Sequence, residues 1–273
     1  MIREGVHLYA PCWNEIDLLG FFFRHYDPWV DRYVIYDDGS TDGTLDVLHA
    51  HPKVEVRALE RATPDSFVHS QTRLNNEAWK DSRGSAAWVV LADIDEHYHH
   101  LSGDLGGYLE AQGALGVTVI PALGFDLNAP TLPVDRGRLV DVVRRGRARI
   151  AFNKLGVFDP DAVVETGLGH GRHVAAPVGD VRLPARDELM LWHYKHLGFE
   201  RWGSRDDDLG SRRGERDIAE RLGQHYFMSA QERVEFWAEM AATSYELGAL
   251  GFEPDQAAVG PLWWSGLPRV RPS

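Results

Sequence analysis

Hydrophobic and polar positions along the first hundred residues follow two patterns in turn. Short apolar runs bounded by turn residues predict strands, and longer stretches with apolar residues three or four positions apart predict helices. The expected strands are residues 6–10, 32–38, 54–60 and 86–95, and the expected helices are residues 14–29, 44–51 and 66–83. Strands that alternate with helices of this length indicate βαβ units and a parallel sheet. The predicted fold class is therefore α/β.

The pattern changes after about residue 100. Shorter apolar runs predict strands and loops over residues 115–125, 139–154, 162–170 and 189–197, and the pattern of residues 200–248 is mostly helical. We expect residues 1–200 to form the α/β domain. Residues 201–273 are expected to form a mostly helical extension that packs on this domain.

Composition narrows the class of protein. The chain has 273 residues and a formal net charge of −12, which argues against a general nucleic-acid binder because such proteins need a basic surface. Cys12 is the single cysteine, so an intrachain disulfide is excluded and a reducing compartment is favoured. The sequence contains no apolar run long enough for a membrane span and no signal-peptide core near its start. We expect a cytoplasmic protein.

The stretch "VLADIDEHYHH", residues 90–100, places acids directly after an apolar run. Asp93 and Asp95 are two residues apart, so on a strand they would point to the same side. Two adjacent carboxylates repel each other unless a cation or a shared proton lies between them. Mg²⁺ and Mn²⁺ are held by carboxylates together with phosphate oxygens. The pair therefore predicts a metal and diphosphate site; the alternative is a helix cap in a solvated turn.

A second acidic turn, "YDDGSTDGT" over residues 36–44, follows the second expected strand. Its glycines permit a tight turn, and its acids can accept hydrogen bonds from ribose hydroxyls. The segment "TDGTL" is also similar to the signature of haloacid dehalogenase phosphatases. Ser40 stands where that signature requires a nucleophilic aspartate, which counts against this interpretation.

Three motifs, "APCWNEIDLL", "YVIYDDGSTDGT" and "VVLADIDE", resemble in order and spacing the family 2 glycosyltransferases. "FNKLGVFDP" and "LWHYKHLGF" resemble a branch of that family with a late His-Tyr motif. The resemblance covers residues 5–200 and implies the GT-A fold, a Rossmann-like, mostly parallel sheet flanked by helices. It also implies metal-dependent transfer of a sugar from a nucleotide-sugar donor, with UDP as the expected nucleotide, to an acceptor hydroxyl with inversion.

The resemblance also implies a role for individual residues. Glu15 and Asp38 would contact the nucleoside, Asp37 would shape that pocket, Asp93 would contact ribose or sugar hydroxyls, Asp95 and His193 would bind Mn²⁺ or Mg²⁺, and Lys154 would neutralise the diphosphate. The alternative for His193 is a core histidine beside Trp192.

The catalytic base is not assigned by the resemblance, because the family's C-terminal "E-D" or "Q-x-x-R-W" signature is absent here. A carboxylate or imidazole must take the proton of the acceptor hydroxyl. The candidates are Asp126, Glu165 and His170, of which we prefer Glu165 and His170. Their alternatives are a solvent-facing acid at a strand end and a loop histidine.

His97, His99 and His100 suggest zinc, but no further His or Cys motif completes a tetrahedral site. We expect these histidines to border the acceptor cleft instead.

Arg145, Arg147 and Arg149 recur at strand spacing, which favours a solvated edge strand. The alternative is a fork for an anionic acceptor, carboxylate or phosphate. The helical extension is a candidate surface for self-association into a homo-oligomer.

Two other functions remain open. Sugar-phosphate nucleotidylyltransferases use the same kind of fold but carry a glycine-rich, basic loop after the first strand, whereas "APCWNE" here has neither glycine nor a basic residue. A non-catalytic nucleotide-sugar-binding domain is the other alternative. The presence of both Asp93 and Asp95 argues against it, because paired acids without a function would be destabilising.

Overall fold

The computed structural model describes residues 5–134, 137–258 and 260–271. Its strands are β1 (Val6–Cys12), β2 (Arg32–Asp37), β3 (Val54–Ala58), β4 (Trp88–Leu91), β5 (Glu96–His99), β6 (Val119–Ala129), β7 (Arg145–Ala148), β8 (Lys154–Phe158), β9 (Val163–Glu165), β10 (Val178–Gly179), β11 (Met190–Leu197) and β12 (Tyr245–Glu246).

Helices connect and cover these strands. The α-helices are α1 (Ile16–Tyr26), α2 (Thr44–Ala50), α3 (Phe67–Glu77), α4 (Leu105–Ala114), α5 (Leu139–Val142), α6 (Phe199–Ser211), α7 (Glu215–Ala219), α8 (Ala230–Thr243) and α9 (Pro254–Ala257). Short 3₁₀ turns are η1 (Ala78–Ser82), η2 (Ile150–Phe152), η3 (His170–Arg172) and η4 (Gln224–Phe227).

The central sheet is mixed. Within the described residues its strand order is β12-β7-β6-β8-β4-β1-β2-β3, with β11 paired to β5 and β6. Strands β3, β2, β1 and β4 are parallel to one another, the β4–β8, β8–β6 and β6–β7 pairs are antiparallel, and β11 is parallel to β6 and antiparallel to β5. The predicted α/β class, with a sheet flanked by helices, is confirmed.

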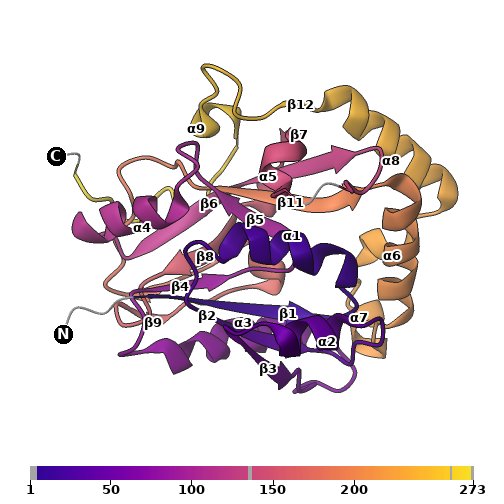
Figure 1. Ribbon diagram of the computed structural model, residues 1–273, viewed down its shortest axis with the longest axis horizontal. Coiled ribbons are helices and arrows are strands. Elements are labelled where there is room, and N and C mark those ends of the chain that lie inside the picture. The colour runs from indigo at the N-terminus through magenta and orange to yellow at the C-terminus, as the bar shows by residue number, and fades with distance from the viewer. Residues whose placement is uncertain (1–4, 135–136, 259, 272–273) are drawn as a thin grey trace.

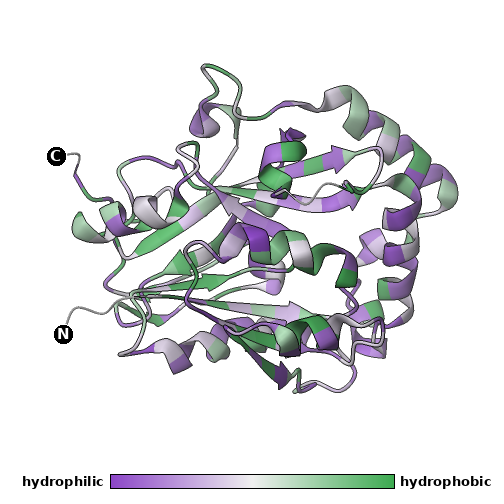
Figure 2. Cartoon of the chain, viewed as in Figure 1, coloured by the Kyte–Doolittle hydropathy of each residue, from purple (hydrophilic) through white to green (hydrophobic). Residues whose placement is uncertain are grey.

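The core lies on both faces of the sheet because successive side chains of a strand point to opposite faces. On one face Leu8 of β1 belongs to a large hydrophobic cluster that includes Phe22 of α1. On the other face Tyr9 belongs to a smaller cluster with Trp79 of η1. All of β4 is buried, as expected for a strand covered on both sides. Figure 2 shows hydrophobic residues running along the central strands.

Two predicted elements were wrong in type or length. Residues 139–154, expected to be strand and loop, contain helix α5, strand β7 and the 3₁₀ turn η2. The strand expected over 86–95 ends at Leu91, and a separate strand, β5, begins at Glu96. β7 pairs with both β6 and β12, so it is not the solvated edge strand that its arginines suggested.

The C-terminal helices stand beyond the carboxyl ends of the strands. In Figure 1 the arrows of β1 and β11 point toward α6 and α7, with α8 beside α6. The chain then returns to the sheet: β12 pairs with β7, and Trp264 is fully buried in the large hydrophobic cluster. Helix α6 therefore closes the end of the sheet where ligands bind in parallel α/β folds.

Candidate functional site

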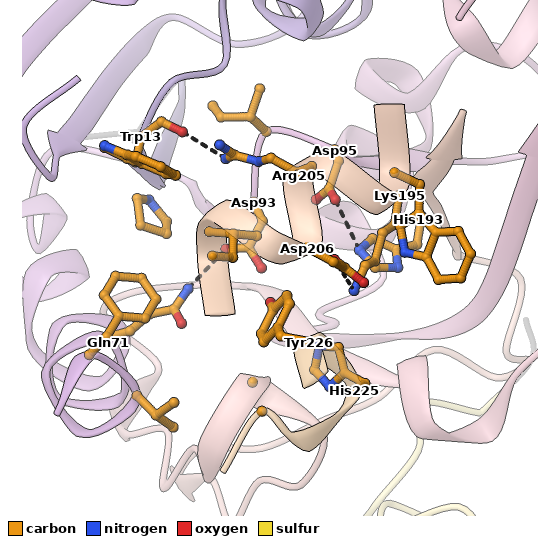
Figure 3. Close-up of a pocket in the computed structure, with 18 of the residues that line it drawn as sticks. Trp13, Gln71, Asp93, Asp95, His193, Lys195, Arg205, Asp206, His225 and Tyr226 are labelled. Carbon is orange, nitrogen blue, oxygen red and sulfur yellow. Dashed lines mark hydrogen bonds and ion pairs between the residues drawn. The ribbon is translucent and has the colours of Figure 1, made fainter. Parts of the chain in front are cut away.

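A cavity of about 540 Å³ lies at this end of the sheet. It is lined by residues of the loop after β1, the turn after β4, strand β11 and helices α3 and α6, among others. The volume is within the range of small-molecule sites. Figure 3 shows Trp13 on one side of the cavity and Asp95, His193 and Lys195 on the opposite side.

Asp93 and Asp95 both line this cavity. They lie in the turn between β4 and β5 and not on a strand, so strand alternation is not what brings them together. Gln71 of α3 donates a hydrogen bond from Nε2 to Asp93 Oδ1 at 3.2 Å. The turn thus presents two carboxylates to a ligand from the end of a buried strand.

Glu96, the next acid in the chain, is fully buried and pairs with two cations. Lys154 Nζ donates to Glu96 Oε1, and Arg172 Nη2 donates to Glu96 Oε2. The same cations lie near Asp93 Oδ2, Lys154 Nζ at 3.9 Å and Arg172 Nη2 at 3.5 Å. Burial alone would raise the pKa of Glu96, but Arg172 and Lys154 hold it well below its usual range. Lys154 also lines the cavity.

Asp95 faces His193 of β11. His193 Nε2 lies 3.3 Å from Asp95 Oδ2, and His193 Nδ1 is buried without a partner among the described residues. Burial opposes charge on both groups, yet their mutual attraction lowers the pKa of Asp95 to about 2 and raises the pKa of His193. The imidazole of His193 therefore lies directly beside the Asp95 carboxylate at the cavity wall.

This pair fits a metal that takes its remaining ligands from substrate and water. In the described part of the chain, no group of three or more His, Cys, Asp and Glu side chains is arranged to hold a metal ion. The Asp95 carboxylate is nevertheless a suitable ligand for Mn²⁺ or Mg²⁺, which commonly keep phosphate oxygens and waters as ligands, whereas the imidazole of His193 is typical of softer divalent metals.

Glu15 and Asp38, both expected to contact a nucleoside, also line the cavity. Arg205 of α6 donates to Glu15 Oε1 and to the Trp13 carbonyl oxygen, the latter at 2.7 Å. Arg212 donates to Asp38 Oδ2 at 2.9 Å, and its guanidinium lies 3.7 Å from the centroid of the Trp13 ring. Burial raises the pKa of Glu15 to about 7 despite the nearby Arg205. Trp13 thus lines the cavity beside two acids, with the guanidinium groups of Arg205 and Arg212 over its ring.

Asp37 does not line the cavity. Its Oδ2 accepts backbone hydrogen bonds from Gly39 at 2.9 Å and Ser40 at 3.0 Å. The side chain therefore shapes the turn after β2 that holds Asp38 in position.

The two preferred candidates for the catalytic base are separated by the fold. His170 lines the cavity, and its Nδ1 lies 2.9 Å from Thr72 Oγ1 of α3. Glu165 lies at the exposed end of β9, outside the cavity, where its carboxylate pairs with Lys80 at 2.9 Å. The structure brings His170 to the other site residues and leaves Glu165 apart.

The histidines after Glu96 do not border the cavity, so that expectation was wrong. His97 is fully buried and stacks on His25 with ring centroids 4.6 Å apart, and burial lowers its pKa well below the usual value. His99 packs against Trp192, and His100 against Tyr108. They are on β5 or just after it, and this strand enters the core instead of continuing along the cleft.

The three arginines on and just after β7 contact different parts of the structure. Arg145 donates to the carbonyl oxygen of Ser244, and Arg147 pairs with Glu239 at 2.9 Å. Arg149 lines the cavity. The three side chains therefore do not form one fork for an anion.

Arg172 and Arg205 were missed by the sequence interpretation. Arg172 is buried at a positive φ of 63° in the turn "GHGRH", and Arg205 lies on a helix expected to be peripheral. The glycines flanking residue 170 are the one local signal of an unusual turn there. The partners of both arginines are more than 70 positions away in the chain, so no local pattern identifies them.

Comparisons with known proteins add little to this site. No known family and no curated protein matches the chain. Among solved structures, a mycobacterial protein is similar with a TM-score of 0.30 and 21% identity over 45% of this chain and 41% of its own. A 4-diphosphocytidyl-2C-methyl-D-erythritol synthase is similar with a TM-score of 0.31 and 14% identity over 59% of this chain and 78% of its own. The chain thus spans less than half of the mycobacterial protein, and likenesses this low carry no argument about function.

Hydropathy adds one finding. Over the described ranges, no helix combines the length and the apolar character that crossing a membrane requires.

Proposed function

We propose that this chain is a metal-dependent glycosyltransferase that moves a sugar from a nucleotide-sugar donor to an acceptor hydroxyl. The observation that supports the proposal is the meeting of Asp93, Asp95 and His193 in one cavity that Glu15 and Asp38 also line. A nucleoside diphosphate needs two kinds of contact: hydrogen-bond acceptors for its sugar and base, and a cation for its phosphates.

In this proposal Asp95 and His193 hold Mn²⁺ or Mg²⁺, which supplies Lewis-acid stabilisation to the leaving diphosphate. Lys154 adds a fixed positive charge at the same end of the cavity, 3.9 Å from Asp93 Oδ2. Asp93 accepts from Gln71 and has further lone pairs for ribose or sugar hydroxyls. Trp13, with Arg212 stacked on its ring, borders the place proposed for the nucleobase, and Asp38 is held in position by Arg212.

The second candidate is a nucleotidylyltransferase, and one observation favours it. The loop after β1 has no basic residue of its own, but Arg205 and Arg212 lie on Trp13 in that loop. Helix α6 and the residue after it therefore place two guanidinium groups over this loop, where Arg205 also pairs with Glu15 and Arg212 with Asp38. In that reaction a sugar phosphate would attack the α-phosphate of a nucleoside triphosphate and release pyrophosphate.

Ligand-dependent unfolding tests the common part of both candidates. Thermal unfolding is measured with UDP, GDP, dTDP and CTP, each with and without Mn²⁺. A ligand at a hundred times its dissociation constant adds about 2.7 kcal/mol of stability. Stabilisation by a nucleotide that requires Mn²⁺ is expected for the wild type and lost in Asp95→Asn. The control is Asp46→Asn, an exposed acid on α2, which should respond as the wild type does.

Product analysis separates the two candidates. A glycosyltransferase releases a nucleoside diphosphate from a nucleotide sugar, whereas a nucleotidylyltransferase releases pyrophosphate from a nucleoside triphosphate and a sugar phosphate. Release of diphosphate with both metal and Asp95 present would support the main proposal. Release of pyrophosphate alone would replace it with the second, and binding without either product would leave a non-catalytic binding domain.

A further inference from the structure

Strand β11 has an irregularity next to the cavity. In a regular strand His193 and Lys195 would share one face and His196 would point to the other. The register of β11 against β6 shifts between His193 and His196. As a result all three of these side chains line the cavity. Bulges of this kind re-aim side chains and are common next to active sites.

His196 is held by a buried carboxylate. Its Nδ1 donates to Asp126 Oδ1 at 2.8 Å, and Asp126 is fully buried. Asp126 Oδ2 accepts no hydrogen bond from the described residues and lies 3.7 Å from Arg149 Nη1. Because Asp126 does not reach the cavity itself, it meets a ligand there only through His196.

The protonation pattern follows from this hydrogen bond. When Nδ1–H donates to a carboxylate, the neutral ring carries its lone pair on Nε2. No described residue hydrogen-bonds to His196 Nε2. Burial lowers the pKa of His196, although Asp126 opposes the shift, so the ring is neutral at pH 7. A neutral imidazole with a free Nε2 is the form that accepts a proton.

The surroundings suit a sugar acceptor. The His196 ring lies 4.9 Å from the Trp202 ring and 5.2 Å from the Phe236 ring, measured between centroids. Phe152 lies 4.5 Å from His193 by the same measure. Apolar ring faces of this kind stack on the C–H faces of sugars. His193 and His196 therefore line the same cavity together with these rings.

We propose that His196 is the catalytic base and that Asp126 is its positioning residue. The inference rests on the proposed glycosyl transfer. The acceptor oxygen forms a bond to the anomeric carbon while its proton passes to His196 Nε2. The bond from the anomeric carbon to the diphosphate oxygen breaks, and its electron pair leaves with the nucleoside diphosphate. The alternative is an Asp–His pair that only stabilises the core.

The test uses the full chain with water as the acceptor. Release of nucleoside diphosphate is followed with UDP-glucose, UDP-galactose, UDP-N-acetylglucosamine, GDP-mannose and dTDP-glucose in the presence of Mn²⁺. His196→Asn is expected to lower kcat on the order of 100-fold or more, since general bases contribute about 10²–10⁴-fold. The Mn²⁺-dependent stabilisation by UDP should be unchanged, because the base does not hold the donor.

Two readouts exclude a purely structural role. Imidazole added to His196→Ala should restore a measurable part of the turnover, and Asp126→Asn should lower kcat with KM unchanged. In nitrogen-15 spectra His196 should be the Nδ1–H tautomer in the wild type and lose that preference in Asp126→Asn. The matched control is His100→Asn, a half-buried histidine outside the cavity whose ring packs on Tyr108 and hydrogen-bonds to Ser102, which should keep turnover within a few-fold.

The outcomes are distinguishable. If His196→Asn binds UDP with Mn²⁺ and keeps turnover within a few-fold of the wild type, His196 is not the base. His196 is likewise not the base if imidazole fails to restore turnover to His196→Ala and this variant unfolds as cooperatively as the wild type. If the wild type neither binds UDP nor turns over any donor, the proposed function fails, and the inference fails with it.

Discussion

Replacing Glu96 with glutamine removes one negative charge from a place where two buried cations depend on it. Glu96 and Lys154 are buried, and the Arg172 side chain is 1% exposed. With Asp93, the four groups form two acids against two cations. In Glu96→Gln the shape is kept, but Asp93 alone faces both Lys154 and Arg172.

Breaking a buried ion pair by neutralising one partner costs about 3–5 kcal/mol, because the other charge stays buried without compensation. For a chain of this size each kcal/mol corresponds to roughly 2–4 °C in Tm. We therefore expect Glu96→Gln to lower the free energy of unfolding by about 3–5 kcal/mol at pH 7.

The pH dependence has a definite sign. The pKa of folded Glu96 is lowered, so its stabilising contribution is present above the unfolded pKa of about 4.3 and is lost as pH falls toward the folded value. The difference between wild type and Glu96→Gln should therefore be largest near neutral pH and shrink below about pH 4.

The assay is urea unfolding followed by far-UV circular dichroism. The matched control is Glu110→Gln, an exposed acid on α4, which should stay within about 0.5 kcal/mol of the wild type. The double variant Glu96→Gln/Lys154→Met restores the charge balance and should be less destabilised than the sum of the two single variants by about 0.5–3 kcal/mol. If Glu96→Gln behaves like Glu110→Gln, or the double variant is strictly additive, the charge argument is refuted.

Two further changes probe the cavity walls. The pKa of Glu15 is raised to about 7 because the effect of burial outweighs that of Arg205. The folded protein therefore loses stability as pH rises from about 4.3, the unfolded pKa, to about 7. In urea unfolding, Glu15→Gln should gain stability relative to the wild type between pH 5 and pH 8. If the difference in free energy of unfolding between the two proteins stays constant over this range, the raised pKa of Glu15 is contradicted. Gly124→Ala places a Cβ 2.2 Å from the Phe152 carbonyl carbon and should cost about 1–3 kcal/mol or more, whereas Gly113→Ala, with its nearest contact at 3.6 Å, should be neutral or stabilising. If the two alanine variants are equally stable to heat, the backbone around Phe152 moves to accommodate the added Cβ.

Local patterns determined the first half of the fold and the acid turn. The alternation of apolar runs and helical stretches over residues 5–91 follows from side-chain periodicity, which is a property of neighbouring residues. Asp93 and Asp95 could be identified as site residues because a buried strand that ends in acids is unusual on its own. The same reasoning placed Glu15 and Asp38 at the ends of parallel strands, where they do meet in one cavity.

Tertiary structure alone decided the partners of these residues. Glu96 looked like a third acid of the motif, but it is buried against Arg172, a residue 76 positions away. The face of β11 on which His196 lies depends on a register shift between two strands. Its carboxylate partner, Asp126, is 70 positions away in the chain. Periodicity reports which face a residue occupies, whereas charge pairing and strand register depend on which distant segment packs there. For that reason the sequence by itself indicated the strand ends that border the cavity, and only the fold decided which other side chains line it.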